Sequence, residues 1–188
     1  FKTLKLVFGN GLITIDGDRW LYRRRLVQPH FHHRHVATMG DQMVQSTIDL
    51  MDRWHGRRVD AEPVDMNVEL SQLTLRNVVQ ALFSMDIKDQ AEYLDALTME
   101  IAELVSKRFA NPLVPPLSVP TPNNRAFITL RGKFNSVIFQ TLAKRRAALA
   151  SGEEFHDLLA LLMSATDGAT GKPLTDEDLR DEIATFAS

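Results

Sequence analysis

The spacing of the apolar residues constrains the fold most strongly, because they recur at three- and four-residue steps along much of the chain. Clear stripes of this kind occupy residues 36–54, 94–105 and 127–142. This spacing places the apolar side chains on one face of an α-helix. Related patterns predict further helices over 17–28, 67–84, 89–109 and 155–163. We therefore predict a mainly α fold.

One segment interrupts this helical pattern, between residues 111 and 123. Five of its residues are prolines: Pro112, Pro115, Pro116, Pro120 and Pro122. Proline lacks a backbone N–H and cannot continue a helix or a central strand. We expect an extended loop here, a second extended link at Val59–Val64, and a long helix that resumes near residue 124.

The clearest helix start lies near the end of the sequence. Thr175 and Asp178 are three residues apart, as in a capping box, and Leu174 and Leu179 are placed for a hydrophobic staple. Acidic residues in the first turn also suit the helix dipole. We predict a helix that begins just after Thr175.

Composition excludes several classes of function. The chain of 188 residues is 44% hydrophobic and 24% charged, with a net charge of −2, so no basic field favours nucleic acid. The absence of cysteine excludes disulfides, thiolate zinc sites and cysteine nucleophiles within these residues. No apolar run reaches 18 residues, and we expect a cytoplasmic protein. A membrane anchor upstream of Phe1 stays an open alternative, because the chain does not begin with Met.

Trp20 and Arg24 are the first candidate functional pair. They are four residues apart and share one helix face. Trp offers a single N–H donor and Arg a charged planar fork, which together suit a carboxylate. The alternative is a cation–π packing pair, and the spacing alone favours it.

The surroundings of this pair resemble one region of the cytochrome P-450 family. The stretch Phe8-Gly-Asn-Gly-Leu12 precedes Gly17-Asp-Arg-Trp20, Arg24 and Pro29-His-Phe31-His32. In that family, a glycine–leucine turn leads into a helix with Trp-x-x-x-Arg that ends in Pro-x-Phe. The proline-rich segment resembles the lid loop between helices F and G, and 174–186 resembles the run into the long central helix. The resemblance implies a partial cytochrome P-450 fold, a multi-helix orthogonal bundle. Residues 1–188 would form a single partial domain, truncated at both ends, from before helix C to the start of helix I.

The resemblance also implies a cofactor, a reaction and a set of site residues. Trp20 and Arg24 would bind the propionates of haem. The substrate pocket would include Leu12, Ile13, Ala184, Ala187 and Ser188. The parent would insert one oxygen atom from O2 into a lipophilic organic substrate, with hydroxylation of fatty acids as the narrower expectation. Electrons would come from NAD(P)H through a redox partner of the ferredoxin- or flavodoxin-reductase type.

The same resemblance predicts what these residues do not supply. The axial cysteine that ligates haem iron would lie outside the chain, because the chain contains no cysteine. We therefore expect no metal ligand and no catalytic residue within it, and the chain alone should be inactive.

Two polar clusters have both a structural and a functional interpretation. Arg23 and Arg25 flank Arg24 and would face outward, either as a solvated basic face or as part of a footprint for an acidic redox partner. Four histidines, His30, His32, His33 and His35, could hold a metal ion. A solvated turn is favoured for them, because one short segment rarely supplies a closed site.

Two other hypotheses for the whole chain remain open at this point. The first is a non-enzymatic helical module that binds a ligand or a partner, with Trp20 and Arg24 as a packing pair only. The second keeps the fold and changes the chemistry, to a peroxygenase or an isomerase that needs no electron donor.

Overall fold

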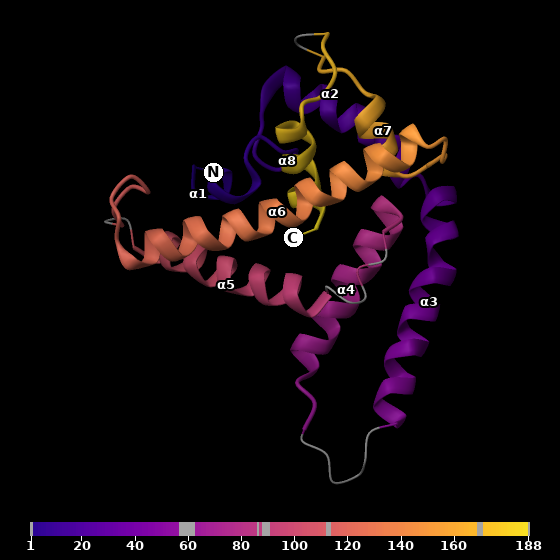
Figure 1. Ribbon diagram of the computed structural model, residues 1–188, viewed down its shortest axis with the longest axis horizontal. Helices are drawn as coiled ribbons and strands as arrows, with labels where there is room; N and C mark the ends of the chain where they lie inside the picture. Colours follow the sequence, from indigo (N-terminus) through magenta and orange to yellow (C-terminus); the bar gives the residue numbers. More distant parts are fainter. Residues whose placement is uncertain are drawn as a thin grey trace.

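The computed structural model describes residues 2–56, 63–85, 87, 91–111, 114–168 and 171–187, and it confirms a mainly α fold (Figure 1). The helices are α1 (Lys2–Phe8), α2 (Gly17–Val27), α3 (His33–His55), α4 (Met66–Phe83), α5 (Ala91–Ala110), α6 (Pro122–Ala150), α7 (Leu158–Ser164) and α8 (Asp176–Phe186). A short 3-10 helix, η1 (Gln28–Phe31), joins α2 to α3. The sequence patterns located all of these helices except α1.

The long helix α6 organises the molecule. Helix α5 packs along it, and the proline-rich loop joins the two at one end (Figure 1). Helices α2, α7 and α8 gather beside the other half of α6, and α1 contacts both α8 and α5. Helices α3 and α4 pack against each other and project away from this cluster. The first and last helices, α1 and α8, thus lie side by side near the middle of the molecule.

The hydrophobic core lies where α5 and α6 meet the short helices. The stripes predicted on these two helices are confirmed as its centre. Its members there are Leu94, Leu97, Ile101, Val105, Phe127, Leu130, Phe134, Ile138 and Leu142. Burial of so many aliphatic and aromatic side chains supplies the main driving force for folding.

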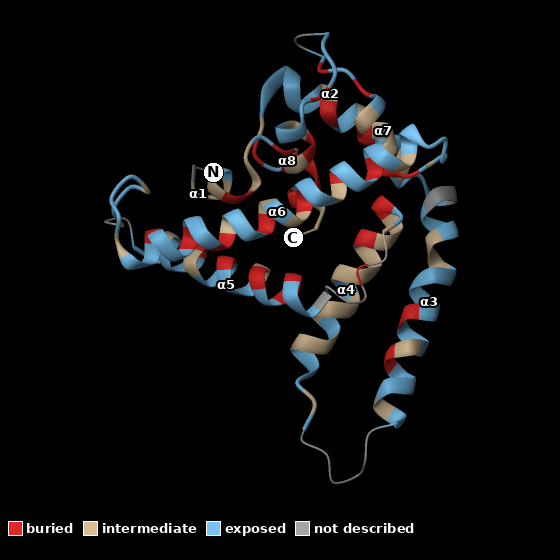
Figure 2. Ribbon diagram, in the orientation of Figure 1, coloured by how far each residue is buried: buried red, intermediate tan, exposed pale blue. Residues whose placement is uncertain are grey.

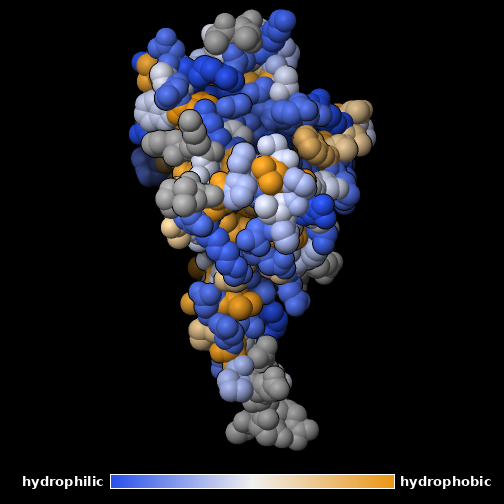
Figure 3. Space-filling view, turned by 90° about the vertical axis from the view of Figure 1, so that its left-hand side faces the viewer, coloured by the Kyte–Doolittle hydropathy of each residue, from blue (hydrophilic) through white to orange (hydrophobic). Residues whose placement is uncertain are grey.

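The predicted stripe on α3 is only partly buried. Leu50 is buried and Met39 packs against the edge of the core, whereas Val36 and Met43 are exposed. Figure 2 shows α3 as a largely exposed helix, because it contacts the rest of the molecule mainly through α4 and η1. The face in Figure 3 is mostly hydrophilic but keeps scattered apolar groups toward the tapered end, where α3 and α4 project.

The helix boundaries follow local chemistry. Helix α2 gives way to η1 before Pro29, as the missing N–H requires. The prediction of a loop through residue 123 is wrong at its end, because α6 begins at Pro122 behind the Thr121 cap. The first helical position tolerates proline, whose absent N–H would have no partner there. The extended link predicted at Val59–Val64 lies mostly outside the described residues.

A buried asparagine holds the described part of the proline-rich loop. The Asn124 side chain donates to the carbonyls of Pro116 and Val119 at 2.9 and 2.7 Å, and it accepts from Arg108. The loop is thus fixed to the ends of α5 and α6. None of the helices in the described ranges is long and apolar enough to cross a membrane.

Candidate functional site

The turn between α1 and α2 lies directly on α8, and two glycines permit this contact. Gly9 has a φ of +55°, and a Cβ added to it would collide with the Asp181 carboxylate. A Cβ added to Gly11 would collide with the Thr185 hydroxyl. Larger residues would therefore push the turn away from α8.

Two consecutive acidic residues of α8 hold this turn through its backbone. The Asn10 N–H donates to Asp181 Oδ2 at 2.5 Å, and the Leu12 N–H donates to Glu182 Oε2 at 3.2 Å. Leu12 packs at the edge of the core, whereas Ile13 is 49% exposed. The turn consequently presents Ile13 outward from a fixed backbone.

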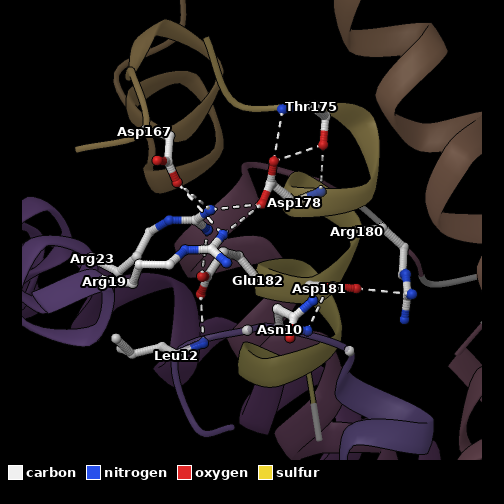
Figure 4. A network of polar contacts seen from close by, with 12 residues as sticks. Asn10, Leu12, Arg19, Arg23, Asp167, Thr175, Asp178, Arg180, Asp181 and Glu182 are labelled. Atoms are coloured by element: carbon white, nitrogen blue, oxygen red, sulfur yellow. Dashed lines mark hydrogen bonds and ion pairs between the residues drawn. The ribbon is translucent and has the colours of Figure 1, made fainter. Parts of the chain in front are cut away.

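An ion-pair network joins α2 to α8 beside this turn (Figure 4). Arg23 is only 1% exposed, and its two terminal nitrogens donate to Glu182 Oε1 at 2.7 Å and Asp178 Oδ1 at 2.8 Å. Asp167 lies 3.8 Å from Arg23 and 3.5 Å from the half-exposed Arg19. The prediction that Arg23 faces outward, toward a redox partner, is wrong, because carboxylates from α8 and from the loop before it hold it inside.

The network perturbs the acidities of α8. Burial raises the pKa of the Glu182 carboxyl above its ordinary value, although the charge of Arg23 acts in the opposite direction. Burial also raises the pKa of Asp181. Burial alone would do the same at Asp178, but hydrogen bonds from Thr175 and Arg23 outweigh it and lower the pKa of that carboxyl. The protein thus holds several carboxyls around one buried guanidinium.

An exposed side of α2, next to the buried Arg23, carries Trp20 and Arg24. Both side chains are exposed, and the Arg24 guanidinium carbon lies 5.1 Å from the centre of the Trp20 ring. Within the part of the chain that the structure describes, neither side chain has a hydrogen-bond or ion-pair partner. The positively charged Arg24 guanidinium and the Trp20 N–H donor therefore lie side by side on one exposed face. This donor set fits the two carboxylates of a haem group.

The remaining predicted pocket residues are separated from Ile13. Ala184 is fully buried in the core, and Ala187 lines an open cavity of about 410 Å³ between α4, α5 and the end of α8. Leu70 and Met66 also line this cavity. Ser188 lies outside the described residues. The structure thus brings Leu12 close to α8 but does not gather the whole predicted set around one described cavity.

The surface residues predicted near α2 lie as follows. Arg25 is exposed, as the partner-footprint hypothesis requires. His32 and His33 are exposed at the start of α3 with their ring centres 4.2 Å apart, and His30 is half-buried. Nothing is described of the His35 side chain. His30, His32 and His33 thus lie at the surface where η1 joins α3.

Comparison with known proteins decides the family. A cytochrome P450 family model matches residues 1–188. The chain belongs to the cytochrome P450 family. Among similar P450 proteins, cyclooctatin synthase of Streptomyces melanosporofaciens is 30% identical over 97% of this chain and 39% of its own length. Cyclooctat-9-en-7-ol 5-monooxygenase of the same organism is 28% identical over 99% of the chain, and rat cytochrome P450 4F4 is 30% identical over 99%.

The P450 chain spans about two fifths of the length of these relatives, with 39% of the two bacterial proteins and 38% of the rat protein covered. The resemblance based on the Trp-x-x-x-Arg helix, the proline-rich loop and the run 174–186 is thereby confirmed at the level of the family.

Sequence patterns predicted Asp178 only as a capping residue, and they missed the buried Glu182 and its pairing with Arg23 in this P450 site. Glu182 follows Leu179 by three residues and precedes Phe186 by four, so it lies on the inward row of α8. Arg23 precedes the buried Val27 by four residues on α2. Arg23 and Glu182 each lie among the apolar residues that face inward on their helices. Opposite charges at two such positions could have predicted a buried ion pair.

Proposed function

We propose that the protein containing this chain is a haem-dependent monooxygenase that inserts one oxygen atom from O2 into a lipophilic organic substrate. Family membership supports the cofactor, and one similar protein is named a 5-monooxygenase of cyclooctat-9-en-7-ol. The single observation that carries the proposal is the exposed Trp20–Arg24 pair, since both polar groups are free to bind an anion. Bound haem would supply the activation of O2.

Trp20 and Arg24 would hold the propionates of this haem. Arg24 contributes a fixed positive charge and a planar fork, and Trp20 contributes one N–H donor and a ring that the guanidinium covers. Because the chain has no cysteine, the thiolate ligand of the iron would come from a residue outside these 188. We accordingly expect no activity from the chain alone.

The substrate would contact the turn and the end of α8. Ile13 is an exposed apolar side chain on a turn that is hydrogen-bonded to α8, and Ala187 lines an open cavity together with Met66 and Leu70. We propose that Leu12, Ile13, Ala184, Ala187 and Ser188 shape the pocket for a lipophilic substrate. Fatty acids are the narrower proposal within this class.

Electrons would reach the haem from NAD(P)H through a redox partner. Arg25 is exposed on the same helix that would hold the haem, so an acidic partner could dock beside the cofactor. Arg23 has no part in this surface, because it is buried. Charge reversal at Arg25 should slow reduction in a salt-dependent way, and an unchanged rate would remove Arg25 from the docking surface.

The test compares two neighbouring arginines in the full-length protein. Arg24→Ala should weaken haem binding about 10- to 100-fold, because one charge-assisted hydrogen bond contributes about 1.5–3 kcal/mol. Arg25→Ala removes the same charge from a position that points elsewhere, and haem binding should be unchanged. A full-length protein that takes up no haem would refute the proposed function, and equal effects of the two variants would refute the role of Arg24.

A further inference from the structure

We infer that Arg23 and Glu182 are positioning residues: their buried ion pair sets the rotation of α2 that presents Trp20 and Arg24, and Glu182 fixes the turn that presents Ile13. This inference rests on the proposed function, since it assumes that Trp20 and Arg24 hold haem.

Helix α2 has little apolar surface with which to set its own orientation. Arg23 and Val27 are the buried residues of this eleven-residue helix. Val27 is buried and Leu26 packs partly buried against the core, but this apolar contact does not by itself select one rotation about the helix axis, because the hydrophobic effect is non-directional. The forked guanidinium of Arg23 does select one, because its two nitrogens bind different carboxylates of α8 at 2.7 and 2.8 Å.

The position of Arg24 follows directly from that of Arg23. Consecutive residues of an α-helix are about 100° apart around the axis. With Arg23 directed into the protein, Arg24 lies about 100° from it around the helix axis, and it lies on the exposed side together with its partner Trp20. A small rotation of α2 would carry both side chains away from any fixed cofactor.

Glu182 couples this helix to the neighbouring turn. One oxygen of its carboxylate accepts from Arg23 and the other accepts from the Leu12 N–H (Figure 4). The side chain is completely buried, so water does not compete for either bond. One α8 carboxylate therefore fixes two segments that are separate in sequence and that would touch cofactor and substrate.

Stability alone explains this arrangement poorly. Burying a charged pair carries a large desolvation penalty, and a well-packed apolar pair of similar volume is often at least as stable. Directional bonds to two segments give an orientation that an apolar pair would not give. This difference separates a positioning role from a merely structural one.

The test uses the haem-loaded full-length protein and measures two quantities, the melting temperature and the rate of haem transfer to apomyoglobin. Glu182→Gln should speed haem loss about tenfold, on the scale of one buried hydrogen bond to a charge. The matched control is Asp157→Asn, which breaks a second buried arginine–carboxylate pair, Arg145–Asp157, between α6 and the start of α7. It should lower the melting temperature at least as much and leave haem loss unchanged.

A second variant guards against simple misfolding. In Arg23→Met/Glu182→Leu, apolar packing should restore the melting temperature, whereas haem loss should stay fast because the turn and the helix lack their directional bonds. Haem retention that recovers together with the melting temperature would overturn the inference. So would equal haem loss in Glu182→Gln and Asp157→Asn. A wild-type protein without haem, or one insensitive to Arg24→Ala, would instead refute the proposed function.

Discussion

Two buried arginines hold the starts of two helices, and they do so in different surroundings. Arg23 donates to Asp178 Oδ1, in the first turn of α8, at 2.8 Å. Arg145 donates to Asp157 Oδ2, at the start of α7, at 2.7 Å. Each aspartate uses its other oxygen at the helix terminus, since Asp178 accepts from Thr175 and Asp157 accepts from the Ala160 N–H. The two pairs thus share one design.

The difference lies in the number of carboxylates. Among the described residues, Arg145 pairs with the single carboxylate of Asp157, donates to the Phe83 carbonyl and lies 3.8 Å from the centre of the Phe155 ring. Arg23 faces Glu182 and Asp167 in addition to Asp178. The first site is a balanced structural pair. The site around Arg23 holds more carboxylates than the arginine needs for charge balance. This excess is consistent with a second role for Glu182, which also accepts from the backbone of the turn.

The largest expected effect tests this distinction. Asp157→Ala should lower the free energy of unfolding by about 3–5 kcal/mol, because it leaves the buried charge of Arg145 without a counter-ion. Glu182→Gln should cost less, about 1–3 kcal/mol, because Arg23 keeps Asp178 at 2.8 Å. Denaturant titrations of the full-length protein measure both. Equal losses would show that the extra carboxylates around Arg23 give no compensation.

The contact between the turn and α8 gives the next effect. Gly11→Ala should destabilise the protein by about 1–3 kcal/mol, because its Cβ would overlap the Thr185 hydroxyl. The control is Gly40→Ala in α3, where nothing lies within 4 Å of the added atom. It should stabilise by about 0.5–1 kcal/mol, because alanine favours a helix interior. Thermal melts of the two variants should shift in opposite directions.

A variant of the capping box tests whether Arg23 alone can hold Asp178 in place, without Thr175. Thr175→Ala removes a cap that accepts from the Asp178 N–H at 3.1 Å, and it should lower stability by about 0.5–2 kcal/mol. Arg23 should still hold Asp178, so haem retention should not change. A large haem loss in this variant would mean that the cap, rather than Arg23, orients the start of α8.

The smallest effect is a dependence on pH. Because burial raises the folded-state pKa of Glu182, the folded protein holds this proton more tightly than the unfolded chain does. The free energy of unfolding should therefore fall as pH rises from the ordinary value of 4.5 through the raised pKa. Asp181 acts in the same direction, whereas Asp178 loses its contribution only as pH falls below 3.8.

Melting temperatures between about pH 4 and pH 7 check this dependence. Glu182→Gln cannot titrate at this position, so its curve should decline less steeply than the wild-type curve. Parallel curves would show that Glu182 keeps an ordinary acidity in the folded protein.

Local patterns in the sequence determined most of the helices and one of their caps. The stripes on α5 and α6 predict the centre of the core, and the Thr175–Asp178 spacing predicts the box that begins α8. The four-residue step from Trp20 to Arg24 places both on one face, as observed. These features depend on residues within one or two helical turns, so the sequence contains all the information that they require.

Only the tertiary structure decided which charges are buried. Arg23 looks like its neighbours Arg24 and Arg25 in the sequence, yet its partners Asp178 and Glu182 are 155 and 159 residues away. The exposure of Val36 likewise depends on how few elements cover α3. A charged side chain can be buried only if its partners offset the free-energy cost of its desolvation. Those partners are brought together only when distant helices pack.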